Sequence, residues 1–128
     1  MWRELRNKLL DSFEPQKGMP ELIKKLRKDH KIGLLSDQTK EWWPYLDKKY
    51  RISENFDFTI ISAETGYHKP QREIYELALN EAGCKPEECI YIDDLEKNLK
   101  PAEELGMKTV LFESPEQVKK ELESIISP

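Results

Sequence analysis

Two adjacent carboxylates end a short apolar run in the second half of the sequence. The run covers residues 89–92 and is followed by Asp93 and Asp94. An apolar run of this length before a helical pattern predicts a buried parallel strand, and open α/β sheets bind ligands at the carboxyl ends of their strands. Neighbouring carboxylates are costly to bury unless a cation or hydrogen-bond donors compensate them. The pair therefore indicates either a Mg²⁺ site, which takes hard oxygen ligands, or a cap of the next helix.

A hydroxyl and an ammonium follow two other predicted strands. Residues 32–36 form an apolar run that ends in Ser36, and residues 56–62 form a second strand pattern, followed by a loop with Lys69. Right-handed crossovers between parallel strands bring the carboxyl ends of the strands to one edge of the sheet. The hydroxyl, the ammonium and the acid pair are therefore expected at one rim. There the ammonium and a Mg²⁺ ion would neutralise a phosphoryl group, while the hydroxyl and backbone N–H groups would hold its oxygens.

Helical patterns separate the predicted strands. Apolar spacing predicts helices near residues 2–13, 20–26, 42–46, 71–82, 95–105 and from 115 onward, and a last strand at 109–112. Two helices are thus followed by four strands that alternate with helices. This order predicts a doubly wound α/β fold, with a parallel sheet of about four strands and helices on both faces.

Composition narrows the class of protein. The chain has 128 residues, 36% of them charged with both signs interspersed, and a net charge of −4. We expect one acidic domain that binds neither nucleic acid nor membranes, because it lacks a basic face, a long apolar run and a signal-peptide pattern. Cys84 and Cys89 have neither metal-site nor redox-motif spacing, so reduced thiols in a cytoplasmic protein are expected.

The motifs in this order resemble those of the haloacid dehalogenase-like (HAD) hydrolase superfamily. Residues 32–36 resemble its second motif, an apolar strand that ends in Ser or Thr. Residues 66–70, followed by Ile74 and Tyr75, are similar to its third motif, which carries a lysine. Residues 90–94, with Asn98, Ala102 and residues 106–107, resemble the fourth. The resemblance extends from about residue 18 to residue 112.

The resemblance implies a Mg²⁺-dependent phosphatase acting on a small phosphate ester, because a metal-free dehalogenase does not need the acid pair. It implies catalytic roles for Ser36, which would hydrogen-bond a phosphoryl oxygen, and for Lys69, which would balance charge. Asp37 would adjoin the phosphate, where the family usually has Asn, and its extra negative charge would weaken anion binding unless it points away. The Mg²⁺ ligands would be Asp93, Asp94 and Asn98.

The family's nucleophilic aspartate, which ends an apolar strand before these motifs, has no counterpart upstream of Ser36. Asp57 does not match this nucleophile, because it lies at the start of a strand and follows Ser36 in the sequence instead of preceding it. Residues 1–14 resemble a remnant of the family's helical cap, and residues 15–128 resemble an incomplete core without its usual central first strand. We therefore expect the chain alone to be inactive. The strands at 32–36 and 89–93 should either close on each other or leave a gap, whose unpaired edges favour self-association.

Two other interpretations follow from the same residues. One is a non-catalytic HAD-like module, or a fragment that needs a partner chain, which binds Mg²⁺, phosphate or a partner without turnover. The other is a response-regulator receiver, which also combines an acid pair, a hydroxyl and a lysine. In a receiver the acid pair comes first and the lysine last, which is opposite to the order of Lys69 and Asp93 in this chain.

Overall fold

The computed structural model of the chain describes residues 19–126. The elements, in chain order, are α2 (Met19–Arg27), β1 (Gly33–Ser36), α3 (Trp42–Tyr50), η1 (Ser53–Asn55), β2 (Phe58–Ile61), α4 (Ser62–Thr65), α5 (Arg72–Ala82), η2 (Pro86–Glu88), β3 (Ile90–Asp93), α6 (Glu96–Leu105), β4 (Lys108–Leu111) and α7 (Pro115–Ile126). The predicted alternation of strands and helices is confirmed. The predicted helix over residues 2–13 and the cap remnant over residues 1–14 lie outside the described residues.

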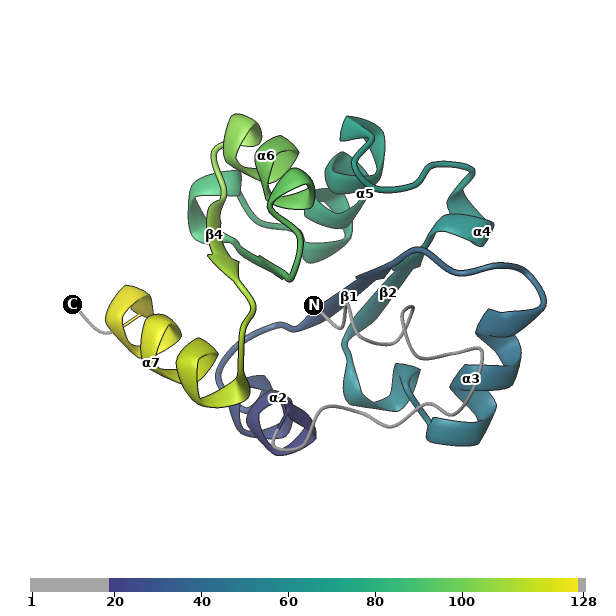
Figure 1. The fold of residues 1–128 in the computed structure, drawn as a ribbon, viewed down its shortest axis with the longest axis horizontal. Coiled ribbons are helices and arrows are strands. Elements are labelled where there is room, and N and C mark those ends of the chain that lie inside the picture. Colours follow the sequence, from purple (N-terminus) through teal and green to yellow (C-terminus); the bar gives the residue numbers. More distant parts are fainter. Residues whose placement is uncertain (1–18, 127–128) are drawn as a thin grey trace.

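The four strands form two parallel pairs rather than one continuous sheet (Figure 1). β1 pairs with β2, with Gly33 opposite Phe58, and β3 pairs with β4, with Ile90 opposite Lys108. Within residues 19–126, no ladder joins β1 to β3. Of the two outcomes expected for these strands, direct closure on each other is therefore not the one observed.

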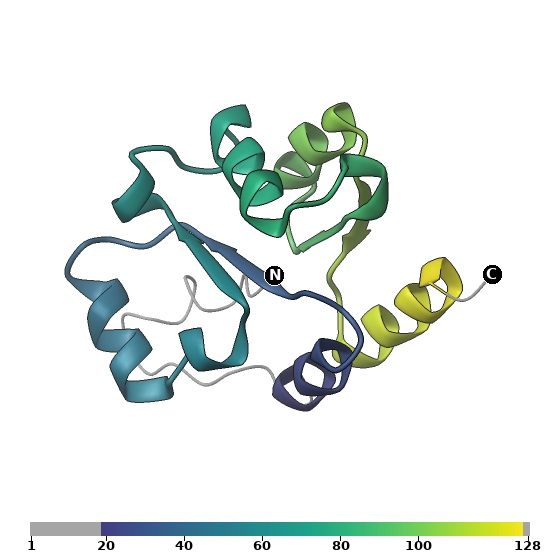
Figure 2. The same ribbon diagram turned by 180° about the vertical axis from the view of Figure 1, so that it is seen from behind.

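Two core clusters show that the strand pairs belong to one layer. Leu34 of β1 and Val110 of β4 share a cluster with side chains of α2, α3 and α7. Leu35 of β1 and Tyr91 of β3 share the other cluster with α5 and α6. Successive strand residues point to opposite faces, so both strand pairs present the same two faces to the same two sets of helices. Figures 1 and 2 show α5 and α6 on one side of the strands and α2, α3 and α7 on the other, which confirms the doubly wound fold.

The helix ends follow the local sequence. α5 and α6 end at glycines in the left-handed region, Gly83 with φ 69° and Gly106 with φ 102°. At the start of α7, the Gln117 N–H donates to Ser114 Oγ at 3.1 Å, and the Ser114 N–H donates to Gln117 Oε1 at 3.2 Å. This reciprocal capping follows from the Ser-Pro-x-Gln sequence of residues 114–117, and it fixes the point at which α7 begins after β4.

Position 33, at the start of β1, has room only for a glycine, because the ring of Phe58 lies directly against its backbone. A Cβ placed on Gly33 would lie 2.1 Å from the Phe58 Cζ atom. The two residues are register partners in the β1–β2 pair. A side chain at position 33 would therefore displace the ring or part the strands at the end far from Ser36.

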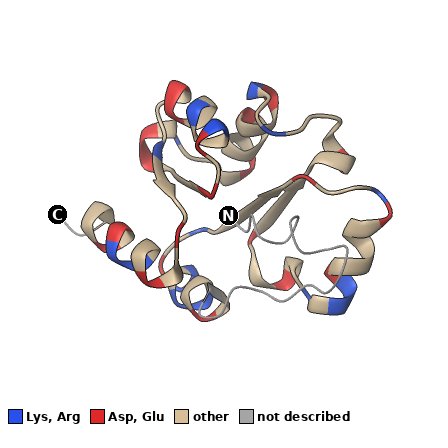
Figure 3. Cartoon of the chain, viewed as in Figure 1, with Lys and Arg blue, Asp and Glu red and all other residues tan. Residues whose placement is uncertain are grey.

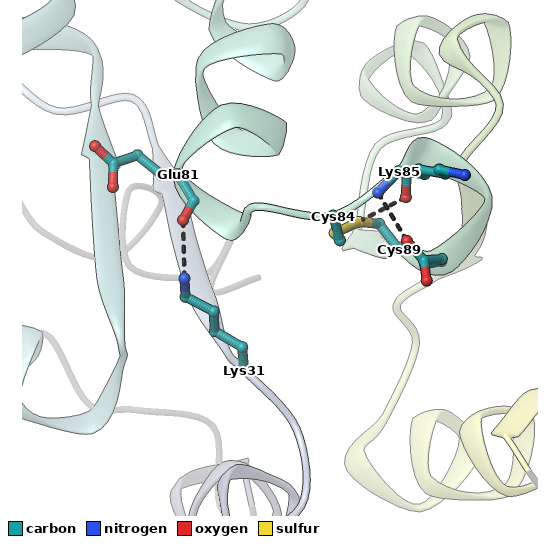
Figure 4. Close-up of a disulfide and its surroundings, with 6 residues drawn as sticks. Lys31, Glu81, Cys84, Lys85 and Cys89 are labelled. Atoms are coloured by element: carbon teal, nitrogen blue, oxygen red, sulfur yellow. Dashed lines mark hydrogen bonds between the residues drawn. A yellow bond between two sulfur atoms is a disulfide. The ribbon is translucent and has the colours of Figure 1, made fainter.

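Cys84 and Cys89 are joined by a disulfide, so the prediction of reduced thiols is wrong for this structure. The helix η2 lies between the two cysteines and reverses the direction of the chain. This brings the two sulfur atoms together, although the spacing of the cysteines is not that of a redox motif. Figure 4 shows the bond beside the Lys85 N–H, which donates to Glu88 Oε1 at 2.9 Å. It also shows Lys31 Nζ donating to the Glu81 carbonyl oxygen at 3.0 Å, which ties the segment before β1 to the end of α5.

Charges of both signs are spread over the outer helices, as the composition predicted (Figure 3). Basic side chains gather in the last turns of α2, at Lys24, Lys25 and Arg27. Arg27 Nε donates to Asp57 Oδ1 at 3.0 Å, and Asp57 Oδ2 accepts the Ile32 N–H at 2.7 Å. Asp57 therefore joins α2 to the start of β1, as an ordinary structural residue. None of the helices within residues 19–126 combines the length and apolar character that crossing a membrane requires.

Candidate active site

Asp93 ends β3 as a fully buried carboxylate with 0% exposure. Its Oδ2 accepts hydrogen bonds from Lys69 Nζ at 3.0 Å and from the Tyr91 hydroxyl at 2.6 Å. Its Oδ1 accepts the Leu95 N–H at 3.0 Å, and Asn98 Nδ2 lies 3.3 and 3.4 Å from the two oxygens. A buried charge requires a counter-charge and filled hydrogen-bonding positions, and Asp93 has both.

The surroundings keep Asp93 ionised. Burial by itself favours the protonated acid and would raise the pKa of Asp93. The positive charge of Lys69, together with hydrogen bonds from Tyr91, Lys69 and Leu95, outweighs burial and lowers the pKa of the Asp93 carboxyl below its usual value. At neutral pH the carboxylate thus carries a negative charge inside the domain, and Lys69 is its ion-pair partner.

Lys69 reaches Asp93 from the loop between α4 and α5. It is buried, and its peptide bond to Pro70 is cis. The Lys69 N–H donates to Asp37 Oδ1 at 3.0 Å. Asp37 therefore fastens the Lys69 loop to the exit of β1, which is a contact that the sequence did not predict. Its predicted place beside a phosphate stays a prediction.

Ser36, at the end of β1, is buried and accepts a hydrogen bond from Gln38 Nε2 at 3.2 Å. The backbone of Gln38 is itself held by Ser62, whose hydroxyl accepts the Gln38 N–H at 2.9 Å and donates to the Gln38 carbonyl at 3.1 Å. Within residues 19–126, Gln38 Oε1 is buried and accepts no hydrogen bond. Sequence reasoning missed Gln38, although its place two residues after Ser36 on an extended segment was a usable signal.

Two buried tyrosines lie beside Asp93, and one of them, Tyr91, was missed as a site residue because its hydroxyl contacts the carboxylate. The Tyr75 hydroxyl donates to the Asn98 carbonyl oxygen at 2.7 Å, and the Tyr75 and Tyr91 rings meet edge to face with centroids 5.3 Å apart. Tyr91 precedes Asp93 by two residues on one strand, so both side chains lie on the same face. That spacing was the signal that could have assigned Tyr91 to the site.

The structure brings most of the predicted site residues together. Lys69 and Asn98 both contact Asp93, and Asp37 joins Lys69 to the β1 exit where Ser36 lies. Asp94 follows Asp93 and is partly buried. The rim therefore combines hydroxyl, ammonium and carboxylate groups from both strand pairs, as the order of the motifs predicted.

Fewer of the predicted residues fit as ligands of a Mg²⁺ ion than the sequence suggested. Within residues 19–126, no group of three His, Cys, Asp or Glu side chains is arranged to hold a metal. Asn98 Oδ1 is nevertheless a buried oxygen that accepts no hydrogen bond from the described residues. Mg²⁺ is typically bound through one or two carboxylates and keeps several waters, so Asp94 and Asn98 fit it by donor type. Asp93 is engaged with Lys69, and its predicted role as a ligand stays a prediction.

The chain is similar to several known hydrolases. It is 39% identical over 74 residues to bifunctional epoxide hydrolase 2 of Rattus norvegicus, a match that covers 58% of this chain and 13% of that protein. It is 31% identical over 108 residues to flavin mononucleotide hydrolase 1 of Arabidopsis thaliana, covering 84% and 44%. It is 39% identical over 83 residues to glyceraldehyde 3-phosphate phosphatase of Methanocaldococcus jannaschii, covering 62% and 36%. Each match thus spans less than half of the relative's length.

Solved structures share the fold. A predicted HAD-like family hydrolase from Porphyromonas gingivalis superposes with a TM-score of 0.77 at 27% identity, over 90% of this chain and 59% of that one. A HAD family enzyme from Bacteroides thetaiotaomicron, in complex with magnesium and inorganic phosphate, superposes with a TM-score of 0.71 at 31% identity, over 80% and 55%. The sequence model for haloacid dehalogenase-like hydrolases matches residues 1–112. With this match and the shared fold, the chain belongs to the haloacid dehalogenase-like hydrolase family.

Proposed function

We propose that this chain carries the phosphoryl-binding and metal-binding part of a Mg²⁺-dependent phosphatase and lacks the attacking carboxylate. The observation that carries the proposal is the buried contact of Lys69 with Asp93 at the strand exits, tied through Asp37 to the exit that holds Ser36. Two of the relatives are a flavin mononucleotide hydrolase and a glyceraldehyde 3-phosphate phosphatase. We therefore propose a small phosphorylated metabolite as the substrate class.

Lys69 would supply the positive charge for the phosphoryl group. An ammonium has three N–H donors, and one of them is used on Asp93. The Ser36 hydroxyl accepts from Gln38, so its own proton is directed to another acceptor, such as a phosphoryl oxygen. Asp94 and Asn98, with Asp93 as a further candidate, would hold Mg²⁺, which when bound withdraws negative charge from the phosphoryl oxygens.

The pure 128-residue chain should bind anions but should not turn over a phosphate ester. We expect inorganic phosphate to bind, as measured by calorimetry, and expect no hydrolysis of p-nitrophenyl phosphate above background with or without Mg²⁺. Ser36→Ala and Lys69→Met should each weaken phosphate binding by about tenfold or more, since a charge-assisted hydrogen bond contributes about 1.5–3 kcal/mol. Lys100→Met, on the exposed side of α6, is the matched control and should bind like wild type.

Two results would contradict the proposal. Phosphate binding that is absent, or unchanged in both site variants, would remove the phosphoryl site. Sustained Mg²⁺-dependent hydrolysis by the pure chain would show that an attacking group is present after all. Circular dichroism of each variant checks that a loss of binding does not come from unfolding.

The second candidate is a module that works with another chain, and the division of the described strands into two pairs favours it. In this version the chain binds phosphate or Mg²⁺ without turnover, and association contributes to its stability. Sedimentation at several protein concentrations tests it, with a concentration-dependent dimer as the expected result. A monomer at every concentration would contradict self-association.

A further inference from the structure

We propose that Tyr91 is a positioning residue that shares the Asp93 carboxylate with Lys69 and so leaves the Lys69 ammonium available to an anion. The inference rests on the proposed function in one respect, namely that Lys69 binds the anion. It adds to the site a residue of the fourth motif to which the resemblance assigned no role.

The geometry at Asp93 Oδ2 carries the inference. The Tyr91 hydroxyl and Lys69 Nζ donate to the same oxygen, at 2.6 and 3.0 Å, and the hydroxyl makes the shorter contact. Both donors are buried, with Tyr91 1% exposed. Because the carboxylate is shut off from water, its negative charge can be compensated only by the groups that surround it.

Removing the Tyr91 hydroxyl would change how that charge is compensated. Asp93 would lose the 2.6 Å hydrogen bond from Tyr91, and Lys69 Nζ at 3.0 Å would then be a nearer donor to Oδ2 than Asn98 Nδ2 at 3.3 Å. The ammonium would then be drawn more strongly to Asp93, because the Coulomb attraction between two charges grows when other compensation is removed in a low-dielectric site. A phosphoryl oxygen would have to compete with Asp93 for the same ammonium, so anion affinity would fall.

Tyr75 provides a matched control within the same cluster. Its ring packs edge to face on Tyr91, it is equally buried, and its hydroxyl makes a hydrogen bond of similar length. That bond goes to the backbone carbonyl of Asn98 and not to Asp93. Tyr75→Phe and Tyr91→Phe therefore delete the same atom from the same kind of surroundings, and they differ in whether the hydroxyl touches the carboxylate.

The experiment compares the two Phe variants of the full chain by phosphate calorimetry and by NMR of the Lys69 ammonium. The NMR signal is assigned by its loss in Lys69→Met. Tyr91→Phe should weaken phosphate binding by about tenfold and shift the Lys69 ¹⁵Nζ resonance, whereas Tyr75→Phe should stay within about twofold in affinity and leave the resonance in place. Both variants should lose stability, so melting temperature alone does not distinguish them.

The inference is overturned if the Lys69 resonance does not move in Tyr91→Phe, or if the two variants change affinity and resonance alike. Its failure can be told apart from failure of the proposed function. Absence of phosphate binding in the wild-type chain contradicts the proposed function, while the resonance comparison still decides whether Tyr91 controls Lys69. Normal phosphate binding with identical behaviour of both variants contradicts only the role of Tyr91.

Discussion

Lys69 and Asp93 form an ion pair with 3.0 Å between Nζ and Oδ2, and their side chains are 2% and 0% exposed. The lysine comes from the loop after α4 and the aspartate from the end of β3, so the pair joins the β1–β2 half of the domain to the β3–β4 half. The pair is central both to the stability of the domain and to the chemistry proposed for it.

Breaking this pair should strongly destabilise the chain. Asp93→Asn or Lys69→Met leaves an uncompensated buried group and should cost about 3–5 kcal/mol in the free energy of unfolding. Urea denaturation measures it. The exposed pair of Arg72 and Glu76, 3.5 Å apart on α5, is the control, and Glu76→Gln should cost less than about 0.5 kcal/mol. If the buried pair and the exposed pair lost similar amounts of unfolding free energy, burial would not be what makes the Lys69–Asp93 pair more important for stability.

The N-terminal cap of α7 should contribute about 1 kcal/mol to the free energy of unfolding. Ser114→Ala removes the hydroxyl that accepts the Gln117 N–H and leaves a backbone donor of the first turn without this partner. Ser124→Ala, at an exposed position inside the same helix, is the matched control and should be neutral or slightly stabilising, because alanine favours helices. Equal effects of the two substitutions on the urea midpoint would contradict the capping role.

Asp57 should make folding stability depend on pH in the acid range. The hydrogen bond from the Ile32 N–H, helped by Arg27, lowers the pKa of Asp57 below its ordinary value of 3.8. A carboxyl whose pKa is lower in the folded state stabilises the fold above its unfolded pKa, and this contribution is lost as pH falls through the folded pKa. Unfolding curves between pH 7 and pH 2 should show a steeper acid loss for wild type than for Asp57→Asn. Parallel curves would contradict the assignment.

Gly33 and Phe58 should behave as a coupled pair. Gly33→Ala places a Cβ against the Phe58 ring and should cost about 1–3 kcal/mol through overpacking. Phe58→Leu makes room, so the double variant should be more stable than the sum of the single effects predicts. A double-mutant cycle by urea denaturation measures the coupling, and additive effects would show that the ring is not what excludes a side chain at position 33.

Asp37 should affect phosphate binding in two opposed ways. Asp37→Asn keeps an oxygen that accepts the Lys69 N–H and removes a negative charge near the anion, so phosphate affinity should rise. Asp37→Ala removes the charge and the tie to the loop together, so it should bind less tightly than Asp37→Asn. Calorimetry of both variants tests this, and an order of affinities with alanine above asparagine would contradict a positioning role for Asp37.

The order of elements in the described range followed from sequence because it depends on local patterns. Apolar periodicity located the strands and helices, and residues such as Gly83, Gly106 and Ser114 marked helix ends through preferences of their own backbone and side chains. The alternation of strand and helix then implied helices on both faces and a shared rim of strand ends. These local patterns were enough to predict that Lys69 and Asp93 lie at the same rim of the sheet.

What the sequence did not determine are contacts between segments that are distant along the chain. It determined the fold class and the residue types at the rim, because both are encoded in local runs. Tertiary structure decided that Asp93 pairs with Lys69, that Tyr91 shares the same oxygen, and that Asp37 holds the lysine loop. It also decided that Cys84 meets Cys89, and that β1 and β3 each pair with a different neighbour. The physical reason is that hydrogen bonds and ion pairs form only within a narrow range of distances and angles. Tertiary packing sets those distances, whereas the periodicity of the sequence does not.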